Sequence, residues 1–289
     1  VYNRMILNKI RPVIDSLLRP TQNAFRPARS TSSPVLGLCI IAEKVRHHKK
    51  VALIVSIDFK KAYAFDSVEE KKMLKIRLPY GILLEVCNAI RVMYENSSAL
   101  LMTPEGNTDV FPIDTGNRRG DPLAPFLFVI CLGYVLRSAI GPSTALTLKK
   151  KGSRRNPEEV LAELAYADDI ALTENTKYAE DLLHNVESAA ESIGLFLKAE
   201  NKDHLTLIAT SESSAHALDG SEIEKVENFL YLEGYMNSAH DVDTRIAKAY
   251  GALNVLSKVL LIPIKKETMH MTSVFKALTE SILLYGCDS

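Results

Sequence analysis

Leu164-Ala165-Tyr166-Ala167-Asp168-Asp169-Ile170-Ala171-Leu172 sets two adjacent carboxylates between two short apolar runs. This pattern is typical of two strands joined by a tight turn, and it predicts a β-hairpin with Asp168 and Asp169 at its tip. Aspartate is common in turns, but two neighbouring acids repel each other, and a cation held between them and a third acid would relieve the repulsion. Mg²⁺ is the natural candidate because it prefers carboxylate oxygens and bound phosphates. By itself, the stretch fits an ordinary turn as well as a metal site.

A third acid, Asp58, follows the nearly continuous apolar run 51–57 (VALIVSI). Such a run is typical of a central strand that is covered on both faces, and at its end a side chain can leave the core for a cleft. If this strand neighbours the hairpin, Asp58 and Asp168 can hold two divalent cations about 4 Å apart, as in-line phosphoryl transfer requires. The alternative is that Asp58 caps the helix that follows it.

The composition excludes several classes of protein. The 289 residues suffice for one large domain or two smaller ones, and 47% hydrophobic with 24% charged residues argues against extensive disorder. Lys plus Arg and Asp plus Glu number 35 each, which argues against coating nucleic acid by bulk charge but permits a basic groove around an acidic site. The four cysteines have no paired spacing, so we expect reduced, mostly buried thiols.

The chain shows no secretion signal, and its longest apolar stretch, 126–136, is too short to span a bilayer. We therefore expect a soluble intracellular protein. The first residue, Val1, and a final apolar helix that is cut short indicate part of a longer polypeptide.

Periodicity predicts helices and strands that are interspersed without regular alternation, which favours an α+β arrangement over a doubly wound sheet. A polar loop is expected at 22–33, a Gly- and Pro-rich loop at 116–125 and a basic loop at 149–155. The expected helices cover 2–18, 34–48, 82–95, about 125–140, 177–192, 240–260 and 267–284, with another from about Ser67; the expected strands lie at 51–57, just before Lys149, and near 204–209 and 226–232, with a hairpin of 98–103 and 109–113.

Seven short sequence motifs follow one another along the chain, and their order is informative. They are Gln22-Asn-Ala-Phe-Arg-Pro-Ala-Arg-Ser-Thr31, Asp58-Phe-Lys-Lys-Ala62, Gly116-Asn-Arg-Arg-Gly-Asp-Pro-Leu-Ala-Pro125, Tyr166-Ala-Asp-Asp169, Gly194-Leu195, Tyr231-Leu232 and Leu283-Leu-Tyr-Gly286. In this order the chain resembles, nearly end to end, the reverse transcriptases of non-LTR (LINE-type) retrotransposons, and particularly the RTE-like group.

The resemblance implies an α+β right-hand polymerase fold, with an antiparallel palm sheet backed by helices. Residues 1–50 and 67–115 would be fingers, 51–66 and 116–238 palm, and 239–289 the start of a truncated helical thumb. The activity would be RNA-directed DNA synthesis, in which a nucleotidyltransferase adds dNTPs to a primer 3′-hydroxyl. The implied partners are an RNA template, a DNA primer or target, dNTPs, and an endonuclease domain in the same longer polyprotein.

The resemblance also assigns site residues. Two Mg²⁺ ions, with Mn²⁺ as a possible substitute, would be held by Asp58, Asp168, Asp169 and the Phe59 carbonyl, the three acids being catalytic. Nucleotide binding would involve Arg26, Arg29, Tyr63, Arg119, Gly120 and Lys202, and nucleic-acid binding Lys149, Lys150, Lys151, Arg154 and Arg155. The cations Arg26, Arg29, Lys202 and those of the basic loop could instead be solvated surface residues. Tyr63 could instead be a half-buried core ring, and Gly120 part of an ordinary loop that starts a helix.

The chain departs from the family pattern at several positions. Two extra residues separate Asp58 from Asp66-Ser-Val, a shift that would turn helical side chains by about 200°. Arg119 replaces a usual Gln, Lys198 a usual Asn and Glu233 a usual Gly, and the register of Lys202 is unsettled. These changes favour the alternative of a diverged, inactive element that keeps the fold and nucleic-acid binding. A group II intron maturase relative is a third reading, without an extension to support it.

Overall fold

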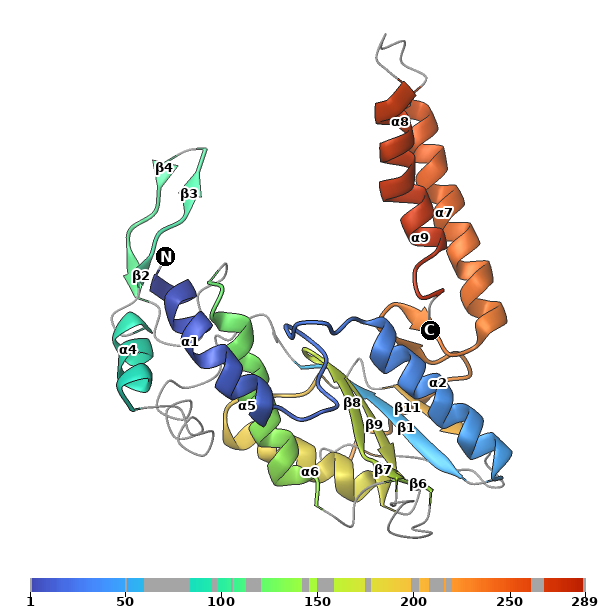
Figure 1. Cartoon of the computed structure of the whole chain (residues 1–289), viewed down its shortest axis with the longest axis horizontal. Coiled ribbons are helices and arrows are strands. Elements are labelled where there is room, and N and C mark those ends of the chain that lie inside the picture. The colour runs from blue at the N-terminus through green and yellow to red at the C-terminus, as the bar shows by residue number, and fades with distance from the viewer. Residues whose placement is uncertain are drawn as a thin grey trace.

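The computed structural model describes residues 2–49, 51–59, 84–94, 98–104, 106–112, 121–141, 146–149, 159–174, 178–198, 203–207, 216, 220–260 and 268–287. A helix expected from about Ser67 and the first half of the Gly- and Pro-rich loop, residues 116–120, lie outside these residues. Two projections rise from a body built on a β-sheet: a ribbon of short strands beside the N-terminal helix, and an arm of C-terminal helices (Figure 1).

A five-stranded sheet forms the centre of the body, in the order β11-β10-β1-β9-β8. All neighbours are antiparallel except β10 and β11, which are parallel. The predicted central strand therefore lies third of five, with β9 of the predicted hairpin directly beside it. The strands are β1 (Ala52–Ile57), β8 (Glu163–Tyr166), β9 (Asp169–Glu174), β10 (Asp203–Leu207) and β11 (Glu224–Lys225).

Strand β1 is buried on both faces, as its continuous apolar run predicts. Successive side chains of a strand point to opposite faces, so Leu53, Val55 and Ile57 enter one hydrophobic cluster, while Ala52 and Ile54 enter another. The sheet thus has a hydrophobic core on each side, and polar side chains can emerge only at the strand ends, where Asp58 lies.

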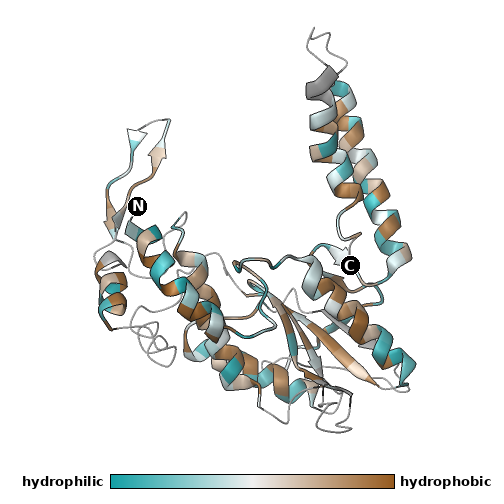
Figure 2. Ribbon diagram, in the orientation of Figure 1, coloured by the Kyte–Doolittle hydropathy of each residue, from teal (hydrophilic) through white to brown (hydrophobic). Residues whose placement is uncertain are grey.

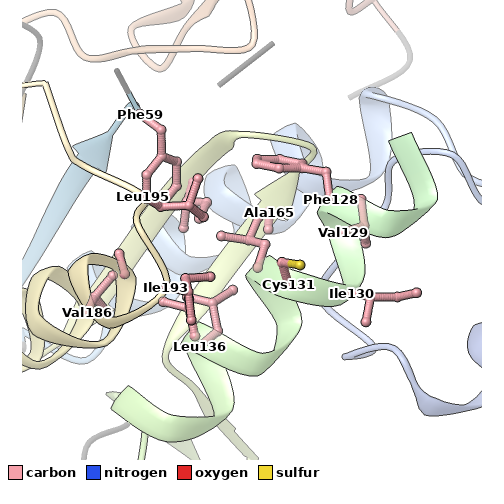
Figure 3. Packing of buried hydrophobic residues seen from close by; sticks show 14 of the residues in the cluster. Phe59, Phe128, Val129, Ile130, Cys131, Leu136, Ala165, Val186, Ile193 and Leu195 are labelled. Atoms are coloured by element: carbon pink, nitrogen blue, oxygen red, sulfur yellow. The ribbon is translucent and has the colours of Figure 1, made fainter. Parts of the chain in front are cut away.

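Helices α5 (Ala124–Ala139) and α6 (Ala179–Ser192) cover the first face of the sheet. Helix α5 is apolar almost all round, with twelve buried residues, because it lies between the sheet, α1 (Tyr2–Leu17) and α6. Figure 3 shows Phe59, just after β1, lying beside Leu195 and close to Ala165 of β8. The Phe59 side chain is fully buried, so the chain leaving β1 is anchored directly after Asp58.

Helix α2 (Ser32–His47) covers the other face. Its Leu38, Ile41 and Val45 pack in one cluster with β1 and with Tyr231 of β12 (Leu230–Tyr231). The brown, hydrophobic side of α2 faces the sheet, and teal residues mark its far end (Figure 2).

The remaining elements form the two projections and a surface strand pair. The ribbon pairs β2 with β5 and β3 with β4, as the predicted hairpin requires, while β6 pairs with β7 below the sheet. The arm continues from the hairpin β12–β13. The bounds are β2 (Ser98–Ala99), β3 (Met102–Thr103), β4 (Gly106–Asn107), β5 (Phe111–Pro112), β6 (Leu146–Lys149), β7 (Glu159–Leu161), β13 (Gly234–Tyr235), α4 (Leu84–Tyr94), α7 (Ser238–Leu260), α8 (Thr268–Phe275), a π-helical segment (Lys276–Glu280) and α9 (Ser281–Leu283).

Most predicted elements are confirmed, and three expectations need correction. Of the strand expected near 226–232, Leu230 and Tyr231 form β12, while β11 lies just before that range, and the last predicted helix contains a π-helical segment. The polar loop at 22–33 begins with two buried residues, Gln22 and Asn23. None of the four cysteines, all of which the structure describes, forms a disulfide; Cys87 and Cys131 are buried, whereas Cys39 is partly exposed and Cys287 exposed. Among the described helices, none is long and apolar enough to cross a membrane.

Candidate active site

The pairing of β1 with β9 brings the three acids to one end of the sheet. Ile57 of β1 lies opposite Ile170, so the next residue of each strand at this end is Asp58 and Asp169. Tyr166 pairs with Asp169 across the hairpin, which leaves Ala167 and Asp168 as a two-residue turn. We call residues 166–169 the carboxylate turn. The predicted hairpin with acids at its tip is therefore confirmed.

The carboxylate turn has an unusual backbone. Ala167 has a φ of +54°, a left-handed value that glycine adopts more readily than any other residue. Such a conformation persists only where the surroundings hold it. Here the neighbouring support is residues 21–23, which run parallel to β8 at the sheet edge: the Asn23 amide donates to the Ala165 carbonyl over 2.9 Å, and the Ala165 amide to the Thr21 carbonyl over 3.2 Å.

The acids at this end of the sheet repel one another. Burial, together with the charges of Asp168, Asp58 and Glu233, raises the pKa of the Asp169 carboxyl to about 6. Burial and the nearby Asp58 charge also raise the pKa of Asp168. Carboxylates with raised pKa values are short of positive charge, which is the electrostatic condition for binding a cation.

Lys198 supplies one positive charge, and sequence reasoning did not foresee its role. Its ammonium lies 2.5 Å from Asp58 Oδ2, and its backbone amide donates to the Asp58 carbonyl over 2.9 Å. Residues 197 and 59 form an antiparallel bridge that sets this register. The bond to Asp58 raises the pKa of Lys198, so the lysine remains charged at neutral pH.

The carboxylate oxygens of the three acids suit a hard divalent cation, although the three side chains are not arranged as a closed metal-binding cluster. Carboxylate oxygens are the ligands that Mg²⁺ prefers. Within the described part of the chain, no group of three or more His, Cys, Asp or Glu side chains is arranged to hold a metal ion. Because Asp58 Oδ2 bonds Lys198, an ion shared by Asp58 and the carboxylate turn would compete with that ammonium for the carboxylate.

Comparison with known proteins identifies the family. The family model described as "Reverse transcriptase (RNA-dependent DNA polymerase)" matches residues 1–232. The chain belongs to the reverse transcriptase family. The prediction of a reverse transcriptase domain of the non-LTR retrotransposon type is confirmed, while the RTE-like subgroup stays a prediction.

Among curated proteins, the chain is similar to the "Retrovirus-related Pol polyprotein from type-1 retrotransposable element R2" of two insects. The Nasonia vitripennis protein is 27% identical over 73% of this chain and 19% of its own length. A Popillia japonica protein of the same name is 26% identical over 72% of this chain and 28% of its own length. The chain therefore spans less than a third of the length of these relatives.

Among solved structures, the chain is similar to telomerase of Candida tropicalis. Apo telomerase truncated from its C-terminal domain has a TM-score of 0.52 at 13% identity and covers 76% of this chain and 43% of its own. Telomerase in complex with a TWJ fragment of telomeric RNA has a TM-score of 0.53 at 12% identity, over 78% and 38%. At such identities the similarity shows the fold alone, and it confirms the α+β right-hand polymerase fold.

The two predicted nucleotide-binding arginines of this reverse transcriptase differ in their surroundings. The Arg26 guanidinium bonds Asp15 Oδ1 over 2.7 Å and the carbonyls of Asp15, Arg19 and Gln22, so it ties the end of α1 to the following segment. Arg29 is exposed, and its guanidinium bonds only weakly to Asn23 Oδ1, over 3.4 Å. Arg29 is therefore better placed than Arg26 to meet a phosphate, although both roles stay predictions.

The other predicted contact residues lie either away from the carboxylate turn or outside the described part of the chain. Lys149 ends strand β6, which pairs with β7 away from the carboxylate turn (Figure 1). The remaining predicted residues lie outside those that the structure describes: Tyr63, Arg119, Gly120, Lys150, Lys151, Arg154, Arg155 and Lys202.

A second two-residue turn lies close enough to the carboxylate turn for the Glu233 charge to act on Asp169. Tyr231 pairs with Gly234, leaving Leu232 and Glu233 as the turn of the β12–β13 hairpin. We call residues 231–234 the arm turn, because α7 follows directly. The Tyr231 hydroxyl donates to the Leu164 carbonyl over 3.1 Å, which joins the arm hairpin to β8 of the five-stranded sheet.

Proposed function

We propose that this chain is the RNA-directed DNA polymerase domain of a non-LTR retrotransposon polyprotein, which transfers nucleotides from dNTPs to the 3′-hydroxyl of a primer on an RNA template. The supporting observation is the β1–β9–β8 pairing, which brings Asp58, Asp168 and Asp169 to one end of the sheet in a member of the reverse transcriptase family. Partners and substrates follow from that family and from the sequence.

In this proposal the three acids hold two Mg²⁺ ions, for which Mn²⁺ can substitute, with the Phe59 carbonyl as a further oxygen. Bound there, the metal would supply activation of the primer hydroxyl and charge stabilisation of the triphosphate and the leaving pyrophosphate. Asp58 would exchange its bond to Lys198 for a place among the ligands. The Lys198 ammonium would then be available to an anionic substrate, beside which a positive charge is favourable.

The proposed division of the chain follows the right-hand fold. Residues 1–50 and 67–115 act as fingers, 51–66 and 116–238 as palm, and 239–289 as the start of the thumb. Arg29 and the other predicted cations contact phosphates of the dNTP and nucleic acids. An endonuclease domain elsewhere in the same polyprotein would supply nicked target DNA as primer.

The second candidate is a diverged element that binds nucleic acid without polymerising. The observation that favours it is the Asp58–Lys198 ion pair, since a lysine that is not displaced would keep metal from the site. The two extra residues after Asp58 add to this reading.

Primer extension separates the two candidates. The purified chain, an RNA template with an annealed DNA primer, dNTPs and Mg²⁺ should give extended product, and Asp168→Ala should give none. Absence of product with wild-type protein, together with retained binding of the primer–template duplex, would contradict the polymerase and support the inactive element. Repeating the assay with Lys198→Asn tests whether the lysine alone prevents synthesis.

A further inference from the structure

A buried glutamine in the segment beside β8 contacts the turn that carries the catalytic acids. Gln22 is only 3% exposed and lies in the stretch expected to be a polar loop. Its Oε1 accepts the Ala167 amide over 3.0 Å, and its Nε2 donates to the Ala167 carbonyl over 3.3 Å. Oε1 also accepts the Ala24 amide over 3.0 Å.

These bonds hold both peptide planes that flank one α-carbon. The Ala167 amide belongs to the plane before the α-carbon, and the Ala167 carbonyl to the plane after it. The angle between these planes is set by φ and ψ of Ala167, so one carboxamide holds the residue at its φ of +54°. The second plane continues into Asp168, and its orientation decides where the Asp168 carboxylate points.

Only a neutral amide of this length provides both bonds. Two amide donors meet Oε1 and one carbonyl meets Nε2, so the opposite orientation of the carboxamide would set donors against donors. A glutamate would lose the donor and add a charge beside the acids, while an asparagine would be shorter by one methylene. The neutral clamp adds no charge of its own, so the Asp168 and Asp169 carboxylates stay available to a cation.

The backbone around Gln22 is itself fixed to β8. The main-chain bonds of residues 21 and 23 to Ala165 set the register, and buried Glu163 of β8 accepts hydrogen bonds from the Arg19 guanidinium and, over 2.6 Å, from the Thr21 hydroxyl. These bonds hold the strap at residues 19–23 in register with β8, which places the Gln22 carboxamide against the Ala167 backbone.

We propose that Gln22 is a positioning residue that fixes the carboxylate turn, and that it thereby sets the metal affinity of Asp168. The link to metal rests on the proposed polymerase function, whereas the link to the turn does not. A site held within about half an ångström of its productive geometry binds and reacts better than a loose one, so release of the turn should weaken metal binding.

The test uses Gln22→Met, which keeps the length and apolar volume of the side chain but loses its hydrogen bonds. Thr21→Val is the matched control: it is an isosteric change in the same strap, and it removes a hydrogen bond that does not touch the turn. Gln22→Asn is a second variant in case Gln22→Met fails to fold. Each protein is studied by hydrogen exchange with peptide mass spectrometry, by Mn²⁺ titration calorimetry and by primer extension.

We expect Gln22→Met and Gln22→Asn to speed hydrogen exchange of the peptide spanning 164–172 at least tenfold and to weaken Mn²⁺ binding about tenfold. In primer extension, kcat should decrease by a larger factor than the factor by which the KM for dNTP changes. Thr21→Val should leave the Mn²⁺ affinity within twofold of wild type. Unchanged exchange in the Gln22 variants would overturn the clamp, with or without metal. Faster exchange with unchanged Mn²⁺ affinity, or an equal loss of affinity in Thr21→Val, would overturn the positioning role. A wild-type chain that neither binds Mn²⁺ nor extends a primer would instead overturn the proposed function.

Discussion

The carboxylate turn and the arm turn both place residues other than glycine in the left-handed backbone region, but different kinds of side chain stabilise them. Both are two-residue hairpin turns without glycine at their left-handed positions: Ala167 has a φ of +54°, and Leu232 and Glu233 have values of +50° and +63°. Each turn is held by side chains from a distant part of the chain. The carboxylate turn is held by neutral Gln22, from the segment after α1.

A cation and a phenol hold the arm turn. The Arg245 guanidinium donates to the Glu233 carbonyl over 2.9 Å and pairs with Asp241 over 2.6 Å. The Tyr285 hydroxyl donates to the Leu232 carbonyl over 3.0 Å, and its ring lies 4.8 Å from the guanidinium carbon. The Asp241 carboxylate also accepts the Tyr235 amide over 2.8 Å. Both carbonyls of this turn are therefore tied to the helical arm.

The difference shows how charge is distributed over the site. The arm turn is bound by the Arg245 guanidinium, whose charge is paired with the Asp241 carboxylate. At the carboxylate turn the clamp is uncharged, and burial together with the neighbouring acids keeps the pKa values of Asp168 and Asp169 raised. The arm turn is thus neutralised by its own ion pair, whereas the turn proposed to bind metal is held by neutral hydrogen bonds and keeps its acids.

Asp168→Asn should have the largest effect, because it removes a proposed metal ligand. We expect primer extension to fall more than about 100-fold, beyond the usual cost of losing an outer-shell partner of a metal ligand. Without divalent metal, the variant should unfold at equal or higher urea concentration, since a repelling charge is gone. Glu233→Gln makes the same change in the arm turn and should extend primers at least as fast as wild type. A slow Glu233→Gln with a normal Asp168→Asn would reverse the roles of the two turns.

Arg245→Met should destabilise the protein by about 3 kcal/mol, because it leaves Asp241 and the Glu233 carbonyl without their partner in a largely buried setting. Urea unfolding measures this loss. A double-mutant cycle with Asp241→Asn isolates the ion pair, and we expect a coupling of about 1–2 kcal/mol. A loss below about 0.5 kcal/mol would mean that the arm turn needs no cation.

The pH dependence of stability should differ between wild type and Asp169→Asn in buffer that contains a metal chelator. Because the folded pKa of Asp169 is raised to about 6, the native state keeps a proton that the unfolded chain has released from about pH 4 upward. The stability of wild type should therefore fall as the pH rises from 4 to 6, and Asp169→Asn should lack that part of the fall. Saturating Mg²⁺ should reduce the difference. Parallel urea midpoints for the two proteins across this range would contradict the raised pKa of Asp169, which burial and the neighbouring acids cause.

Tyr285→Phe should have the smallest effect, about 0.5–1 kcal/mol, because it removes a single hydrogen bond from a partly exposed side chain and keeps the ring beside Arg245. Urea unfolding again provides the measurement. If the loss equals that of Arg245→Met, the hydroxyl and not the guanidinium is the principal support of the arm turn.

Local patterns in the sequence were sufficient for most of the fold. The continuous apolar run of β1 predicts a strand covered on both faces, and two apolar runs around Asp168 predict the hairpin that carries the two adjacent acids. These inferences succeed because burial on both faces, alternation and tight turns leave their marks on neighbouring residues. The order of motifs then predicted the reverse transcriptase family.

The partners of the polar side chains could not be inferred in the same way. Gln22 was expected in a polar loop, yet it is buried because its carboxamide meets three backbone groups, two of them on Ala167. Lys198 was expected only as a departure from a family pattern, yet it pairs with Asp58. Whether a polar residue is solvated or buried depends on which distant segments supply its hydrogen bonds.

The sequence by itself therefore determined the secondary structure, the central strand and the hairpin that carries the acids, since each follows from the burial pattern of contiguous residues. Only the tertiary structure decided that β1 pairs with β9, that residues 21–23 run beside β8, and that the arm holds the turn at Leu232–Glu233. Those outcomes depend on contacts between residues up to 145 positions apart, for which local periodicity carries no information.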